Sequence, residues 1–161
     1  MRFLKIVCLA AAFATLPALA APQGEREWLG TVFLAQPDCA PRFPLYSEPG
    51  TRSSIGRTLE RRGYRWLKDE EWVTTLLAPA DARFAGHRVL RLAIPNAEMS
   101  VYAITVMGSP EALAGAIAAR TGRTLRIMQG EPARKSGEPY IVAAGPGQSS
   151  FVCFSFEEGT P

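Results

Sequence analysis

The chain has few side chains of the types that carry acid–base, nucleophilic or metal chemistry. It contains one histidine, His87, although histidine is the most common general base and a frequent metal ligand. A serine nucleophile would need His87 beside it, and the sequence has neither a Gly-x-Ser-x-Gly elbow nor a Ser-x-x-Lys motif. Since His87 follows Gly86 at the start of an expected strand, an exposed or capping imidazole is the ordinary interpretation. We therefore predict no catalytic residue, no metal site and no cofactor.

Two other segments could carry chemistry, and both have a simpler interpretation. The acidic triplet at residues 69–71 (DEE) could supply paired carboxylates, but a run of acids between Lys68 and Trp72 is typical of a solvated turn. The glycine-rich segment at residues 145–150 (GPGQSS) has no lysine and precedes a strand, where a phosphate-binding loop needs a helix. A small hydrolase that uses His87 or a pair of carboxylates stays as the enzymatic alternative.

The first twenty residues have the pattern of a secretory signal peptide. Arg2 and Lys5 precede an apolar run that ends in the small-residue cleavage site ALA at residues 18–20. The apolar run is too short to cross a bilayer, which needs about 20 apolar residues. We therefore expect a signal peptide at residues 1–20 and one exported domain at residues 21–161. That domain would reside in the periplasm or be secreted, with no membrane span after cleavage.

Export determines how the cysteines are interpreted. Cys8 lies in the expected signal peptide, so the exported domain keeps Cys39 and Cys153. Two thiols in an oxidising compartment most often pair, and we expect a single Cys39–Cys153 disulfide. An intermolecular bridge and two buried free thiols are the alternatives. Two cysteines with one histidine are too few for a structural zinc site.

The charge of the exported domain argues against nucleic acid as a partner. The full chain has 18 Lys and Arg against 15 Asp and Glu. Two of the basic residues and none of the acidic ones lie in the first twenty positions, which leaves 16 against 15. Nucleic-acid-binding domains usually carry a clustered basic face and a clear positive charge. We expect another envelope or secreted protein as the partner, with no nucleic acid.

A group of arginines with neighbouring aromatic residues is the candidate partner-binding region. Arg57, Arg61 and Arg65 would share one face if this stretch is helical. Such a row of arginines could bind an acidic partner, anionic lipid or phosphate. The other interpretation is an ordinary solvated face, with the tryptophans in the core rather than on a ligand-stacking surface. The candidate partner-binding residues are Arg57, Arg61, Arg62, Arg65, Tyr64 and Trp72.

Part of this region resembles a known family. Residues 45–59 (LYSEPGTRSSIGRTL) and the later Trp72-Val73 are similar to the opening of bacterial SH3-like domains, in which a strand, a proline-containing turn, an Ile/Val-Gly step and a tryptophan recur. The resemblance ends at Leu77. It implies a small β-barrel segment over residues 45–77 that binds cell-wall peptide or a protein. An envelope-associated module that binds peptidoglycan is therefore the second functional hypothesis.

The patterning of the exported domain predicts a mixed α+β fold. Ser109, Pro110 and Gly122 are preferred capping, first-turn and stop residues, and they bracket a helix over about residues 110–121. Residues 51–67 fit either a helix that ends near Gly63 or short strands. Strands are expected over residues 28–35, 72–77, 88–94, 99–107, 125–128, 140–144 and 150–156.

These elements predict a mostly antiparallel sheet of about five to seven strands with one main helix, a β-α-β-β-β C-terminal half and a single disulfide. Export, near-neutral charge and the lack of an assembled catalytic group favour a non-enzymatic periplasmic or secreted protein-binding module. We expect it to be of the inhibitor or immunity type, directed against an envelope-targeting enzyme. A cell-wall-binding module and a small hydrolase are the alternatives.

Overall fold

The computed structural model describes residues 27–35, 45–48, 50–96, 100–129 and 137–155. The signal peptide expected at residues 1–20 lies outside these ranges. None of the helices within them is long and apolar enough to cross a membrane. The elements in chain order are α2 (Trp28–Phe33), β1 (Tyr46–Glu48), β2 (Thr51–Arg52), α3 (Ser54–Arg61), β3 (Arg65–Asp69), β4 (Val73–Leu77), β5 (Arg83–Phe84), β6 (His87–Pro95), β7 (Ser100–Met107), α4 (Pro110–Thr121), β8 (Arg126–Met128), β9 (Tyr140–Gly145) and β10 (Gln148–Ser155).

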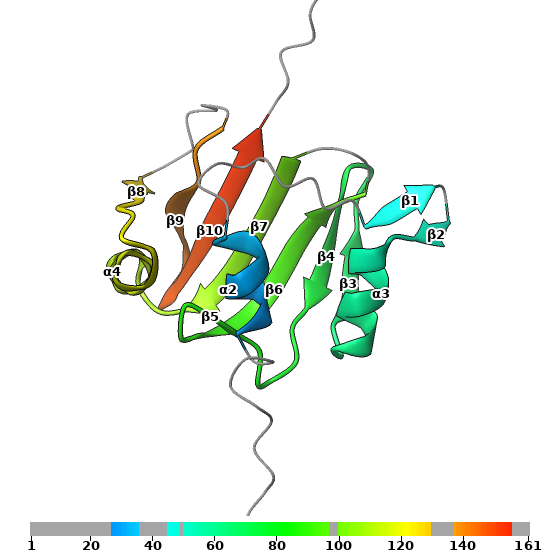
Figure 1. Ribbon diagram of the computed structural model, residues 1–161, viewed down its shortest axis with the longest axis horizontal. Coiled ribbons are helices and arrows are strands. Elements are labelled where there is room, and N and C mark those ends of the chain that lie inside the picture. The colour runs from blue at the N-terminus through cyan, green and yellow to red at the C-terminus, as the bar shows by residue number, and fades with distance from the viewer. Residues whose placement is uncertain (1–26, 36–44, 49, 97–99, 130–136, 156–161) are drawn as a thin grey trace, which may run out of the picture.

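An eight-stranded, mostly antiparallel sheet forms the centre of the fold (Figure 1). Its strands follow the order β3-β4-β6-β7-β10-β9-β8, and β5 pairs with β6 outside this path. β8 and β9 pair in parallel, and β1 and β2 form a separate two-stranded sheet. The predicted α+β class and mostly antiparallel sheet are confirmed. The sheet has one strand more than the upper limit of our expectation. Residues 28–35 do not form a strand, but β3, which begins in the ambiguous segment, and β5 both join the sheet; β5 is only two residues long, too short for an alternating pattern to reveal it.

The C-terminal half has the predicted β-α-β-β-β order, formed by β7, α4, β8, β9 and β10. The helix covers the expected residues: Ala112 N donates a hydrogen bond to Ser109 Oγ at 3.2 Å, and Gly122 ends the helix at φ 70°. β7 and β9 both run antiparallel to β10, and β8 runs parallel to β9. β7 and β8 therefore point the same way, and α4 is the crossover between them.

The N-terminal segment corrects one prediction. We expected a strand over residues 28–35, but Trp28–Phe33 forms helix α2. Leu29 and Phe33 are buried, whereas Thr31 is exposed. A strand would place all three side chains on one face, while a helix turns Thr31 away. A helix also satisfies much of its own backbone hydrogen bonding, so this segment can lie across the sheet face rather than pair at an edge. The aromatic and β-branched content was therefore misleading here.

Residues 51–67, which were ambiguous, contain both kinds of element. Gly56 N donates a hydrogen bond to Ser53 Oγ at 3.1 Å, which caps α3, and β3 begins four residues after the helix ends. The SH3-like resemblance implied a β-barrel segment over residues 45–77. Instead, α3 separates the strands of this segment, and β3 and β4 pair within the main sheet.

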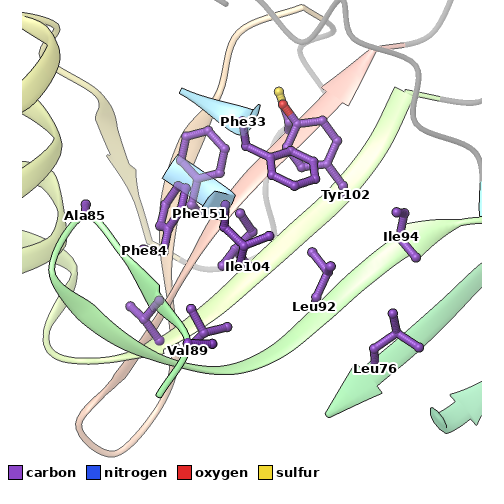
Figure 2. Packing of buried hydrophobic residues seen from close by; sticks show 14 of the residues in the cluster. Phe33, Leu76, Phe84, Ala85, Val89, Leu92, Ile94, Tyr102, Ile104 and Phe151 are labelled. Carbon is purple, nitrogen blue, oxygen red and sulfur yellow. The ribbon is translucent and has the colours of Figure 1, made fainter. Parts of the chain in front are cut away.

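The core lies on one face of the sheet (Figure 2). Leu76, Leu92, Ile104 and Phe151 occupy paired positions on four neighbouring strands, and each side chain is at most 2% exposed. α2 covers this face, with the Phe33 ring centroid 4.5 Å from that of Tyr102 in β7. The paired row on the opposite face consists of smaller, half-buried side chains: Thr75, Ala93, Ala103 and Val152.

Cys153 is fully buried in β10, where alternation places it on the core face with Phe151. Cys39 lies outside the described residues. The Cys39–Cys153 disulfide therefore stays a prediction.

Two helical glycines should respond oppositely to alanine. A Cβ atom on Gly56 would lie 2.6 Å from the backbone oxygen of Leu45, so we expect Gly56→Ala to lower the free energy of unfolding by about 1–3 kcal/mol. A Cβ atom on Gly115 in α4 would meet nothing within 4 Å, and Gly115→Ala should stabilise by up to about 1 kcal/mol. Urea unfolding of both variants measures the difference. Stabilisation by both substitutions would contradict the close approach of α3 to Leu45.

Candidate protein-binding surface

The hairpin formed by β3 and β4, residues 65–77, carries an unusual concentration of exposed apolar side chains. Leu67 is 54% exposed, Trp72 57% and Leu77 36%. They are three of the five large apolar side chains that are exposed in the described part of the chain, and they lie within eleven residues. Scattered exposed leucines are normal on protein surfaces, but grouped ones mark a contact surface. We call this segment the β3–β4 hairpin; β3 is the edge strand of the main sheet.

The turn of the hairpin is held by a network of hydrogen bonds. Asp69 accepts hydrogen bonds from the Thr74 hydroxyl and, at 3.3 Å, from Trp66 Nε1. Asn96 Nδ2 donates to the backbone oxygen of Glu70 at 2.8 Å, which connects the turn to the end of β6. The acidic triplet at residues 69–71 is thus part of an exposed turn, as predicted. Trp72 extends from this ordered frame.

Arg52 joins the base of the hairpin to the preceding elements. Its guanidinium carbon lies 3.6 Å from the ring centroid of Trp66 and 4.4 Å from that of Tyr46, and its Nε donates to Glu60 Oε1 at 2.9 Å. Burial acts to lower the pKa of Arg52, but the hydrogen bonds and charge interactions with Tyr46 and Glu60 together outweigh it, and the pKa is raised above its usual value. The cation–π and ionic contacts therefore connect β1, β2, α3 and β3.

The structure separates the predicted arginines. Arg57 and Arg61 are exposed on α3. Arg57 Nη1 donates a hydrogen bond to the backbone oxygen of Arg52 at 2.6 Å, and Arg61 Nη2 donates one to Thr58 Oγ1 at 3.1 Å. Arg62 lies at the end of the helix with its guanidinium 4.8 Å from the ring centroid of Trp28. Arg65 does not share the helical face, because α3 ends at Arg61 and Arg65 begins β3.

The two predicted aromatic residues have opposite environments. Tyr64 is 5% exposed, and burial raises the pKa of its phenol well above the ordinary value, so it belongs to the core. Trp72 is the most exposed large apolar residue of the described chain. Trp28 and Trp66 are half-buried against the core, as the core interpretation of the tryptophans predicts, but that interpretation is wrong for the exposed Trp72.

Sequence reasoning missed a cleft beside the hairpin. A cleft of about 560 Å³ is lined by residues of β3, β4, β6 and β10 and of the segment that follows β4, and its polar lining is Arg65, Arg88, Arg91 and Gln148. Arg91 Nη2 donates to Gln148 Oε1 at 3.4 Å. No sequence motif joins these residues, because they come from three strands that are far apart in the chain.

His87 is half-buried at the start of β6 and contacts the backbone. Its Nδ1 lies 3.0 Å from the Met107 carbonyl oxygen, which can only accept, so Nδ1 carries the proton. Gly108 lies against the ring: a Cβ atom there would be 2.7 Å from His87 Nδ1. No group of three or more His, Cys, Asp or Glu side chains within the described ranges is arranged to hold a metal ion.

Comparison with known protein families, curated proteins and solved structures finds no match to this chain. The functional assignment therefore depends on the surface described above.

Alanine substitutions should distinguish the roles of the two aromatic residues. Tyr64→Ala removes a buried ring and should lower the free energy of unfolding by about 3 kcal/mol or more. Trp72→Ala removes a mostly exposed ring and should change it by less than about 0.5 kcal/mol. Chemical denaturation of both variants provides the measurement. A Trp72→Ala variant as unstable as Tyr64→Ala would mean that Trp72 is a structural residue and not a free contact residue.

Proposed function

We propose that this chain is a non-enzymatic, exported protein-binding module of the inhibitor or immunity type, and that it binds another envelope or secreted protein through the β3–β4 hairpin. The observation that carries the proposal is the grouping of Leu67, Trp72 and Leu77 on one ordered hairpin with arginines beside it. The composition of the exported domain agrees with a protein partner, because its net charge is close to zero.

The chemistry of the hairpin is that of a protein interface. Trp and Arg are among the residue types enriched at positions that dominate binding energy, and interfaces combine an apolar centre with a polar rim. Trp72 and Leu67 would supply the anchors, and Arg65 and Lys68 the polar surroundings. Since the turn is already held by the contacts of Asp69, less conformational entropy would be lost on binding.

Contact through side chains is favoured over addition of a strand to the edge of the sheet. The register shifts between Trp66 and Lys68, so Leu67 is an extra residue opposite β4. Such a bulge bends the strand and interrupts the regular backbone hydrogen-bonding pattern that an added strand would need. It also removes Leu67 from the regular alternation, and the residue is 54% exposed. The bulge would therefore prevent edge-to-edge aggregation while leaving an apolar side chain available to a partner.

Partner capture with matched variants tests the proposal. The immobilised chain would be incubated with extract of the envelope and secreted fractions of its source cells, and the specifically retained protein quantified. Trp72→Ala and Leu67→Asp should each reduce its recovery at least tenfold, because they remove anchors without altering the core. Arg65→Glu should also weaken capture, because Arg65 belongs to the hairpin, whereas Arg61 lies on α3. Ile127→Ala is the matched control: Ile127 is 37% exposed on β8, at the other edge of the sheet.

Two outcomes would overturn the proposal. Equal recovery with the Trp72 and Ile127 variants would mean that the hairpin does not bind the partner. Sedimentation of the chain with purified peptidoglycan, lost in Trp72→Ala, would instead support the cell-wall-binding alternative. Inhibition of an enzyme by the wild-type chain but not by Trp72→Ala would support the inhibitor type specifically.

Export also leads us to propose the Cys39–Cys153 disulfide. Protein purified from the periplasm and alkylated under denaturing conditions without reductant should gain no alkyl groups, and reduction should expose both thiols. A bridge that closes such a long loop should make the oxidised chain about 2–5 kcal/mol more stable than the Cys39→Ser variant in urea unfolding. Alkylation of both thiols before reduction would disprove the cross-link.

A further inference from the structure

The cleft next to the β3–β4 hairpin brings three arginines together. Strand register aligns Arg65 with Leu77 and Leu77 with Arg91, so these three positions form one row on the face of the sheet opposite the core. Arg88 and Gln148 complete the polar lining of the cleft, which has a volume of about 560 Å³. All three arginine side chains are exposed to solvent.

The arginines of this cleft differ in their ionic contacts from other arginines in the described part of the chain. None of the ion pairs found among the described residues includes Arg65, Arg88 or Arg91. By contrast, Arg52 pairs with Glu60 at 2.9 Å and Arg120 with Glu27 at 2.6 Å. Guanidinium groups bind carboxylates and phosphates through paired, charge-assisted hydrogen bonds.

The remaining walls of the cleft are apolar. Leu77, Pro79, Val89 and Leu90 line it together with two alanines. A cleft of this mixed kind suits an acidic group that is attached to an apolar one better than it suits a fully hydrated ion. Leu77 and Arg65 also belong to the β3–β4 hairpin, so the cleft continues the surface described above.

We propose that this cleft is a carboxylate-binding subsite that receives an acidic side chain, flanked by apolar residues, from the protein partner. This inference rests on the proposed function, because the carboxylate would come from the protein partner proposed there. The ability of the cleft to bind an anion is argued from its own lining residues and does not depend on that partner. Arg88 and Arg91 would hold the carboxylate, Arg65 would add charge at the hairpin side, and Leu90 with Pro79 would contact the neighbouring apolar side chain.

Small probes test the subsite without the partner. A blocked peptide in which glutamates alternate with leucines should bind the wild-type chain in fluorescence or NMR titration, and the matched peptide with glutamine should bind at least tenfold more weakly. The double variant Arg88→Gln/Arg91→Gln should weaken binding of the glutamate peptide at least tenfold. Arg57→Gln/Arg61→Gln is the control, since these two arginines are exposed on α3 and do not line the cleft.

The outcomes separate this inference from the proposed function. Trp72→Ala should retain binding of the glutamate peptide even if it abolishes capture of the protein partner. Citrate and inorganic phosphate form the second arm: tight binding of either one, without binding of the peptide, would overturn the assignment of a protein carboxylate and indicate a free small anion. No binding of any probe, or equal loss in both double variants, would overturn the subsite itself. Circular dichroism of each variant verifies that it is folded.

Discussion

The register of the strands is the constraint from which the rest of this structure follows. Because one face of the sheet is buried against α2 and the other is not, each strand must place its large apolar residues on the same side, and a slip of one position would reverse every side chain. Leu76, Leu92, Ile104 and Phe151 satisfy this requirement on four paired strands. Once that row is fixed, the residues next to each of its members along the same strand must face the opposite side of the sheet.

Two interruptions of that register create the proposed binding surface. On β6, Val89 and Arg91 pair with the consecutive residues Val106 and Thr105, so one residue of β6 is extra at this point. Without this bulge Arg88 and Arg91, three positions apart, would point to opposite faces; with it, both line the cleft. The bulge on β3 likewise takes Leu67 out of the regular alternation at the edge of the sheet. Bulges that reorient side chains are common near functional sites, which agrees with the proposal.

Two groups of arginines are distinguished in this structure, those with structural contacts and those that line the cleft. Arg52 stacks on two aromatic rings and pairs with Glu60, Arg62 lies over Trp28, and Arg120 pairs with Glu27, so these three help to hold helices against the rest of the fold. The arginines of the cleft have no such ionic contact among the described residues. Composition treats all of these residues alike, and only their surroundings distinguish a structural cation from one that is available to a ligand.

Local signals in the sequence determined the parts of the fold in which neighbouring residues interact. Ser109, Pro110 and Gly122 specify α4 because capping involves groups within a few residues of one another. The hairpin of β9 and β10 and the exposed turn at residues 69–71 follow from equally local patterns. The mostly antiparallel α+β class could be predicted because apolar periodicity records which face of an element is buried.

Tertiary structure alone decided the rest, because the decisive contacts join residues that are far apart in the chain. The apolar content of residues 28–35 fits a strand, and only the sheet face available near Tyr102 makes it the helix α2. The exposure of Trp72 and the burial of Tyr64 could not be read from their types, since both are aromatic residues in an arginine-rich segment. The cleft depends on a bulge and on pairing between three strands, and a single sequence records neither directly.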